Sequence, residues 1–312
     1  MELSIILLNW NAAGDTLRCI QAISRWQKIK PTIWVVDNAS VDDSVVQIHG
    51  KAPQVRLIQS AENLGFAGGS NLGIRASLAE RERPILMLNN DATIDEDSVI
   101  RLMTTLAEGP ANGFVGPLLY EAEHSDRLIS AGGKNPVLHQ NTRLTAPPEA
   151  AATFQVDCIS GTAILIAADV FRRVGLLDET YFFSTELADL CARATGQGFR
   201  CLIDTRAQAR HTVSRSARFR DTLYVYYVIR NRFIYIRKFY SRLAKGALLS
   251  FWSIYSLALA LKLRLTGQRA TAKAVWLGLE DGLRQRFGGQ NERVLAACRV
   301  SGASLDTNLS ET

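Results

Sequence analysis

The sequence predicts an α/β protein with a doubly wound, mainly parallel sheet, helices on both faces, and a helical appendage at the C-terminus. Two observations support this fold class. Apolar runs alternate with stretches of helical spacing four times in roughly the first 106 residues. In the run that follows Pro84, four apolar residues follow one another without a polar residue between them, which is typical of a strand covered on both faces.

Four strands are expected in the N-terminal part of the chain, at residues 3–9, 33–36, 55–58 and 84–88. A helix over 15–26 connects the first two, and a connection of that length predicts parallel neighbours. The glycine-bearing stretch 63–71 leads into a helix ending at Ala79. Another helix, over 95–106, has acids in its first turn, where the helix dipole favours them.

The middle of the chain is less regular. Residues 113–119 predict a strand, and the polar, proline-bearing stretch 121–152 predicts a long loop or a short hairpin over the sheet. Regular structure is expected again at 156–166, followed by residues 169–174, a turn at Gly175 and the stretch 178–193, where Asp178 and Glu179 can start a helix. We therefore place the main domain at residues 1–221.

The composition becomes aromatic and basic from Thr222, so 222–300 is predicted as the helical appendage and 301–312 as a disordered tail. Residues 247–261 carry no charge, but this run is shorter than the roughly 20 residues of a spanning helix. It predicts an in-plane helix with Trp252 and Tyr255 at a membrane interface. A helix buried against the main domain, or against a second subunit in a homodimer, is an equal alternative.

Bulk properties narrow the class of protein only partly. The chain has 312 residues, 47% of them hydrophobic and 21% charged, which describes a folded protein. Its net charge of +6, with most of the arginine excess after Arg193, suits an anionic partner: nucleic acid, acidic lipid or a pyrophosphate. Five cysteines without C-x-x-C spacing and an N-terminus without a basic segment predict a cytoplasmic location and no secretory signal.

Polar residues end two of the predicted strands. Asn89, Asn90 and Asp91 follow the fourth strand, and Asp37 follows the second, so all should border one crevice at the carboxyl edge of the sheet. A carboxylate flanked by amides can hold a hard divalent cation together with phosphates. The same residues can equally form a simple turn. Neither a G-x-G-x-x-G nor a G-x-x-x-x-G-K-[ST] motif is present.

Taken in order, the motifs resemble inverting family 2 glycosyltransferases of the GT-A fold, in the branch of bacterial rhamnosyltransferases and other polysaccharide transferases. The matching segments are 8–11, 36–40, 63–71, 88–91, 160–162, 175–179, 181–183, 189–191 and His211. The resemblance covers about residues 2–231. It implies the GT-A fold and a nucleotide-sugar donor that carries UDP, GDP or dTDP.

The resemblance also implies site residues. Donor binding falls on Asn9, Asp37, Asn63, Gly65, Gly68, Asn71, Asn89 and Asn90, with Asp37 at the base and Asn90 near the ribose. A divalent metal, Mg²⁺ or Mn²⁺, would lie on Asp91 with His211. A glycan or lipid-linked acceptor would bind Gly161, Thr162, Asp178, Glu179 and Arg230. We expect Gly65, Gly68 and Gly69 to form an open loop that a ligand can approach closely.

Inverting transfer needs a base that deprotonates the acceptor hydroxyl. The family usually carries a Glu-Asp pair at this point, and here the pair reads Glu186-Leu187, which is a departure from the pattern. Glu186 and Asp189 are three residues apart and would share one helix face. We favour Glu186 as the base, with Asp189 second.

Other functions stay open at this level. Leu187 keeps a non-catalytic nucleotide- or glycan-binding subunit as the main alternative. A sugar nucleotidyltransferase is weakened because no glycine-rich, basic loop follows the first strand. The aromatic and basic cluster from Tyr226 to Arg232 has three possible roles: it can bind an acceptor pyrophosphate or lipid headgroup, stack on nucleic acid, or pack against another helix. We favour binding of the pyrophosphate or headgroup and expect no nucleic-acid partner. We expect peripheral attachment at the inner face of the cytoplasmic membrane.

Overall fold

The computed structural model describes residues 2–124, 126–147, 151–212 and 220–298, so the predicted tail 301–312 lies outside the described residues. Contacts divide the chain into two units. The first contains residues 1–179 and 186–213, and the second contains 180–185 and 214–312. The division after 213 falls a few residues before the predicted boundary at 221, and the assignment of 180–185 to the second unit is not foreseen in the sequence.

The first unit is built on one sheet whose four leading strands are parallel. The strands are β1 (Ser4–Asn9), β2 (Thr32–Asp37), β3 (Arg56–Gln59), β4 (Ile85–Asn89), β5 (Ala92–Ile94), β6 (Asn112–Glu121), β7 (Leu128–Ser130), β8 (Thr153–Gln155), β9 (Ala163–Ile166) and β10 (Arg200–His211). Their order is β3-β2-β1-β4-β9-β6-β10-β5, with β7 on β6 and β8 on β10. The chain runs outward from β1 to β3 and then returns to place β4 on the other side of β1, which creates a switch point.

The sheet is parallel only in part. Strands β3, β2, β1 and β4 are parallel, as are β6 and β10. Strand β9 runs antiparallel to both of its neighbours, β4 and β6, and β5 runs antiparallel to β10. The predicted α/β class is confirmed, and the sheet as a whole is mixed.

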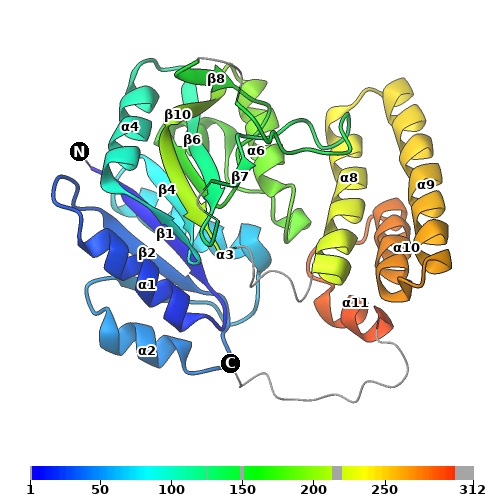
Figure 1. Ribbon diagram of the computed structural model, residues 1–312, viewed down its shortest axis with the longest axis horizontal. Helices are drawn as coiled ribbons and strands as arrows, with labels where there is room; N and C mark the ends of the chain where they lie inside the picture. Colours follow the sequence, from blue (N-terminus) through cyan, green and yellow to red (C-terminus); the bar gives the residue numbers. More distant parts are fainter. Residues whose placement is uncertain (1, 125, 148–150, 213–219, 299–312) are drawn as a thin grey trace. The chain divides into compact units, whose positions relative to one another are not determined.

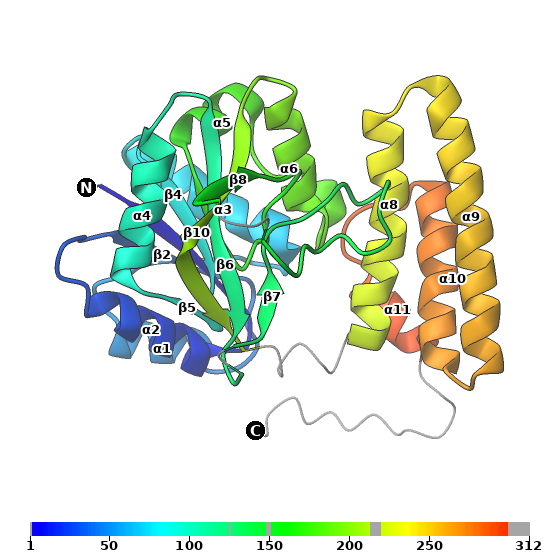
Figure 2. The ribbon, with the colours of Figure 1, turned by 45° about the horizontal axis from the view of Figure 1, so that its top comes forward.

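Helices cover both faces because successive strand residues point to opposite sides. The helices of this unit are α1 (Ala13–Ser24), α2 (Ser44–Lys51), α3 (Gly65–Glu80), α4 (Glu96–Ala107), α5 (Ala168–Val174) and α6 (Glu186–Thr195). Ile5 and Leu7 of β1 belong to a core with buried residues of α1, α2 and α4. Ile6 belongs to the opposite core, with α3, α5 and α6. Figures 1 and 2 let the reader follow these layers.

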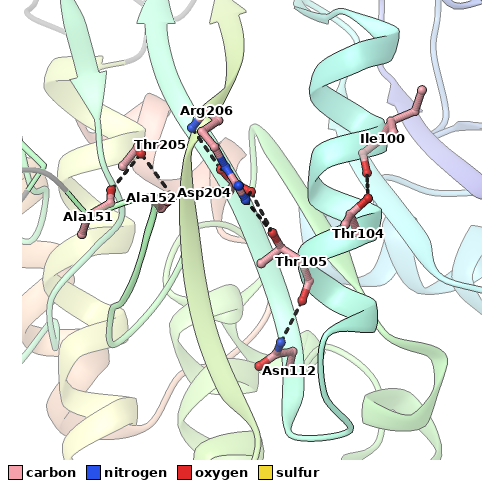
Figure 3. Close-up of polar contacts among 9 residues, drawn as sticks. All are labelled: Ile100, Thr104, Thr105, Asn112, Ala151, Ala152, Asp204, Thr205 and Arg206. Atoms are coloured by element: carbon pink, nitrogen blue, oxygen red, sulfur yellow. Dashed lines mark hydrogen bonds and ion pairs between the residues drawn. The ribbon is translucent and has the colours of Figure 1, made fainter.

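A buried carboxylate ties α4 to β10 (Figure 3). Asp204 is fully buried and accepts hydrogen bonds from Thr105 Oγ1 at 2.8 Å and Arg206 Nη2 at 2.7 Å. Thr105 in turn accepts from Asn112 Nδ2 through its carbonyl oxygen at 2.8 Å. Burial raises the pKa of Asp204, but the bonds from Arg206 and Thr105 outweigh it, so the net pKa lies below its ordinary value.

The second unit is helical, as predicted. A short turn of π-helix (Arg220–Tyr224) precedes α8 (Val225–Phe239), α9 (Arg242–Leu265), α10 (Arg269–Arg284) and α11 (Asn291–Cys298). Its core contains Phe182, Tyr226, Tyr227 and Val294. The fully buried Asp281 accepts a hydrogen bond from the Tyr226 hydroxyl at 2.6 Å and forms ion pairs with two arginines, Arg286 and Arg293.

Candidate active site

The carboxyl ends of β1 and β2 carry a buried polar network. Asn9 and Asp37 are register partners on these parallel strands, and Asn9 Nδ2 donates to Asp37 Oδ1 at 2.8 Å. The Ser40 hydroxyl and backbone N–H donate to the same carboxylate at 2.6 and 3.0 Å. Asp37 is 2% exposed. Asp37 therefore closes the β2 turn in this structure, and its predicted contact with a nucleotide base stays a prediction.

The network continues to β4 across the switch point. The Thr16 hydroxyl donates to Asn9 Oδ1 at 2.7 Å and accepts from Asn90 Nδ2 at 3.0 Å. Asn89 Cα pairs with Leu8 on β1, so the ends of β1 and β4 meet where the strand order reverses. The structure thus brings Asn9, Asp37 and Asn90 together at one edge of the sheet.

Asp91 and His211 meet although they are far apart in sequence. Strands β5 and β10 pair antiparallel with Ala92 opposite His211, and the backbone N–H of Thr212 donates to the Asp91 carbonyl oxygen at 3.2 Å. His211 Nε2 lies 3.1 Å from Asp91 Oδ1. The Asp91 Oδ1 atom is buried and accepts no hydrogen bond from the described residues.

This pair fits a divalent cation. Two ligands on adjacent corners of an octahedron, each about 2.1 Å from Mg²⁺, are separated by about 3 Å. The 3.1 Å separation and the unpartnered Oδ1 match that arrangement. Within the described ranges no group of three His, Cys, Asp or Glu side chains gathers, so most of the coordination would fall to phosphates and water.

The predicted glycine loop is wrong for Gly68 and Gly69, because α3 already begins at Gly65. A Cβ on Gly69 would lie 2.6 Å from Leu8 Cδ1, and one on Gly68 would lie 2.7 Å from Leu64 Cβ. Gly69 therefore lets α3 pack tightly on β1, and Gly68 leaves room for the Leu64 side chain at the start of the helix. Gly65 has φ of +70°, a conformation that favours glycine.

Two asparagines of the donor motif fix loops through their side chains. Asn63 Oδ1 accepts from Asn38 Nδ2 at 3.0 Å, which joins the β2 turn to the entry of α3. Asn71 is fully buried, donates to the Leu177 carbonyl at 2.9 Å and accepts from the Leu177 N–H at 3.1 Å. Asn71 Nδ2 also donates to Glu179 Oε1 at 2.8 Å. These roles position backbone, and direct donor contacts by Asn63 and Asn71 stay predictions.

The predicted acceptor residues of the first unit lie on the segments around β9 and before α6. The Thr162 carbonyl accepts from the Asn89 N–H at 2.9 Å, which places Thr162 beside the end of β4. A Cβ on Gly161 would lie 3.2 Å from the Phe66 ring. Glu179 is exposed and pairs with Arg75 at 3.0 Å, and Asp178 is half-buried just before it.

The two candidate bases differ in what they contact. Glu186 begins α6, is 7% exposed, and its Oε2 is buried with no hydrogen-bond partner in the described part of the chain. Burial raises the pKa of Glu186 to about 7, and the charge of Asp189 adds to that effect. Asp189 is fully buried and accepts from Arg193 Nε at 2.6 Å. Glu186 therefore has an oxygen available for proton transfer, whereas Asp189 is engaged by Arg193.

Leu187, the departure from the family pattern, packs into the core beside Gly161 and is 5% exposed. A carboxylate at this position would be buried in apolar surroundings, which is costly without a partner. The position is structural in this chain, and Glu186 carries the acid of the pair alone.

Arg230 lies within the second unit and is fully buried. Its guanidinium donates to the carbonyl oxygens of Gly288 at 2.5 Å and Tyr181 at 2.6 Å, and to Asn231 Oδ1 at 2.9 Å. Asn231 Nδ2 donates to the carbonyl of Ser184 at 2.6 Å. The predicted contact of Arg230 with an acceptor pyrophosphate is not favoured by this placement, because its donors are directed at the protein backbone.

Sequence reasoning did not single out Thr16, and it included Asn231 only as a member of the Tyr226 to Arg232 cluster. Thr16 lies in an ordinary amphipathic helix and gives no signal of its own. Asn231 is the centre of an Arg-Asn-Arg triplet within an aromatic helix, and that polar triplet in an otherwise buried stretch is the signal that pointed to it.

The mixed sheet, with polar residues at its switch point, has the GT-A fold. Two solved structures share the fold. A mannosyltransferase from Pyrobaculum calidifontis, solved with GDP-Man and Mn²⁺, aligns with a TM-score of 0.58 at 14% identity over 91% of this chain and 87% of its own. TarS 1-349 of S. aureus aligns with a TM-score of 0.55 at 15% identity, over 95% of this chain and 83% of its own.

The chain belongs to glycosyl transferase family 2, whose family model matches residues 4–175. It is 28% identical over 77% of its length to a low-salt glycan biosynthesis hexosyltransferase of Haloferax volcanii, also covering 77% of that protein. It is 24% identical to an N-acetylglucosaminyl-diphospho-decaprenol L-rhamnosyltransferase of Mycobacterium tuberculosis, over 67% of this chain and 75% of that one. The family and the assignment as a glycosyltransferase of glycan biosynthesis, both made from the motifs, are confirmed.

Proposed function

We propose that this glycosyltransferase is inverting and metal-dependent, and that it moves a hexosyl or deoxyhexosyl group from a UDP, GDP or dTDP sugar to a hydroxyl of a glycan or lipid-linked acceptor. The unpartnered Oδ1 of Asp91 beside His211 carries the proposal. Solved neighbours hold GDP-Man or UDP with Mn²⁺, and a relative acts, by its name, on a diphospho-decaprenol substrate. These ligands support the donor and acceptor classes.

Glu186 is the proposed base. Its buried Oε2 takes the proton of the acceptor hydroxyl as that oxygen bonds to the anomeric carbon and the bond to the nucleoside diphosphate breaks on the opposite face. A divalent cation held by Asp91 and His211 would, when bound, offset the charge on the departing diphosphate. The bonds among Asn9, Asp37 and Thr16 keep the crevice edge rigid, so little ordering is needed when the donor binds.

Calorimetry with UDP, GDP and dTDP, each with Mn²⁺, Mg²⁺ or EDTA, tests the donor site. We expect metal-dependent binding of one nucleotide, abolished by Asp91→Ala. Asp97→Ala is the matched control, because Asp97 lies exposed on α4 and forms an ion pair with the exposed Lys28. Failure of all three nucleotides to bind wild type would remove the proposal.

The alternative of a non-catalytic binding subunit is favoured by one observation, the apolar Leu187 in place of an acid. It predicts metal-dependent nucleotide binding without sugar transfer in the presence of acceptor. Transfer that disappears in Glu186→Gln would exclude it.

We also propose that the protein works in the cytoplasm, at the inner face of the membrane. The five cysteines are free, which suits a reducing compartment.

A further inference from the structure

Helix α9 is apolar on the side that faces away from its own unit. Six large side chains form this outward stripe, with exposed fractions of 91, 58, 68, 45, 59 and 78%: Leu243, Phe251, Ile254, Leu257, Leu261 and Leu265. From Phe251 onward they recur every three or four residues and so lie on one helix face. The opposite side holds the buried Trp252 and Ser256. A helix that is apolar all round belongs in a protein core or in lipid.

The stripe is too long for ordinary surface scatter. A helix of 24 residues is about 36 Å long at 1.5 Å per residue. Single exposed apolar residues are common on soluble proteins, but a row that recurs at every turn from Phe251 to Leu265 marks an interaction surface. Since the row has no partner among the described residues, the question is what covers it.

Charge favours an anionic occupant. Between Asp221 and Glu280 the chain has ten Lys and Arg residues and no acid. Arg242 and Lys245 lie at the start of α9, and Lys262 and Arg264 lie at its end. A second copy stacked stripe on stripe would bring these cations together without compensation, whereas lipid phosphates would neutralise them.

The helix also satisfies the length and hydropathy of a membrane span, with a mean hydropathy of 1.5 over its best 18 residues. The side of α9 that packs within its own unit argues against a helix that crosses the membrane. The buried Arg232 of α8 stacks over the Trp252 ring at 3.7 Å, so crossing the bilayer would carry an arginine into hydrocarbon. Trp252, predicted at the membrane interface, is 4% exposed and packs inside the protein instead.

We propose that the outward stripe of α9 lies in the plane of an anionic bilayer, with its apolar side chains among the acyl chains and its terminal Lys and Arg residues at the lipid phosphates. This surface would hold the enzyme where a lipid-linked acceptor is presented. The inference depends on α9 alone and not on the donor site or on Glu186.

Cosedimentation of the full chain, purified without detergent, with phosphatidylglycerol-containing and pure phosphatidylcholine vesicles tests the proposal. We expect binding to the anionic vesicles that weakens with salt. The double variant Ile254→Glu and Leu257→Glu should lose at least tenfold in partitioning. Lys262→Gln with Arg264→Gln should lose about fivefold per charge on anionic vesicles.

The matched control is Val41→Glu with Val46→Glu, which places two acids on exposed apolar positions of the first unit, 78 and 73% exposed. It should bind vesicles as wild type does. Circular dichroism establishes that each variant is folded. Wild type that stays in the supernatant with anionic vesicles overturns the proposal, and a dimer in light scattering that Ile254→Glu dissociates would assign the stripe to a second copy.

Discussion

Glu186 and Asp189 lie one turn apart on α6, yet their surroundings give them different chemistry. The Asp189 carboxylate receives Arg193 Nε, and the other nitrogens of Arg193 donate to the carbonyls of Val174 and Leu176. This arrangement joins α6 to the segment after α5. Glu186 keeps one buried oxygen without a partner, which costs stability and suits a group that must accept a proton.

The pH dependence of the reaction should report Glu186. Its pKa is raised from 4.5 to about 7, so the base form accumulates as the pH rises through that value. We expect kcat/KM to rise about tenfold per pH unit below pH 7 and to level above it. Glu186→Gln should lower kcat by roughly 10² to 10⁴ and remove this limb.

The raised pKa of Glu186 also makes the stability of the folded state depend on pH. Between pH 4.5 and about 7 the unfolded chain has lost the proton that the folded Glu186 still holds, so stability falls as pH rises through this window, and Glu186→Gln should abolish that contribution. Asp189→Asn should instead lose about 1–3 kcal/mol of stability at all these pH values. If Glu186→Gln retains turnover and its kcat/KM depends on pH as in wild type, the base is another residue.

The convergence of Asn9, Asp37 and Asn90 could be predicted because they stand at or just after strand ends, which meet at one edge of the sheet whatever the details of packing. The pairing of Asp91 with His211 was expected only from the resemblance. It depends on β5 lying antiparallel to β10, and three residues of β5 are too few to give a periodic signal. The burial of Arg230 was missed for a related reason, since a long cationic side chain is assigned to the surface unless its partners are known.

At the scale of elements, α8 holds the loop 180–185 through backbone carbonyls. Three residues of this segment, Phe182, Ser184 and Thr185, have φ between +63° and +79°, which is costly for side chains other than glycine. Asn231 donates to the carbonyls of Phe183 at 2.8 Å and Ser184 at 2.6 Å. These bonds keep the segment in a conformation that it would not adopt alone, and the next residue in the chain is Glu186.

Asn231→Ala should therefore affect both stability and rate. Loss of the amide leaves buried carbonyls without their donor, which costs about 1–3 kcal/mol in urea unfolding. We expect kcat to fall while the KM for the donor is unchanged, because Thr185 directly precedes the proposed base. Asn141→Ala, at an exposed position, is the control. Lower stability with an unchanged kcat would limit Asn231 to a structural role.

The Asp204 contacts predict a second stability effect, between α4 and β10 (Figure 3). Because the folded pKa of Asp204 is lowered from 3.8, its contribution is present above that value and is lost as pH falls below it. Asp204→Asn should lose about 1.5–3 kcal/mol near neutral pH, and the difference from wild type should shrink below about pH 4. Thr105→Val, which leaves Arg206 in place, should lose about 1 kcal/mol. A difference between Asp204→Asn and wild type that is independent of pH would contradict this account.

The order of the early strands and helices could be predicted because buried parallel strands and amphipathic helices have distinct periodicities. The reversal of β9 could not, since a run of four apolar residues looks the same in either direction. The start of α3 was misplaced because three glycines within five residues suggest a loop, although Gly69 is needed for close packing against β1 and Gly65 for its positive φ.

For the whole molecule, the two units have separate cores, and the cysteines are distributed over both. Burial, with the charge of Asp91, raises the pKa of Cys19 to about 12, and burial likewise raises the pKa of Cys158, Cys191 and Cys298. A thiol with a raised pKa holds little of the nucleophilic thiolate. The native protein should be insensitive to thiol reagents.

Ellman's reagent at about pH 8 checks this expectation. The native chain should react slowly, and the guanidinium-unfolded chain should release colour for all five cysteines at once. A rapid native reaction of even one thiol would show that its surroundings open readily in solution.

The path of the chain between the units restricts how such a protein can be recombined. The polypeptide passes from the first unit to the second after Glu179, contributes residues 180–185 to the second unit, re-enters the first at Glu186 and passes to the second again after Val213. A chimera that joins this catalytic half to the helical half of a relative must therefore transplant 180–185 together with the C-terminal helices. With a single junction near residue 213, residues 180–185 of this chain would have to pack against the α8 of the relative. The mismatch would disturb Thr185, the residue directly before the proposed base.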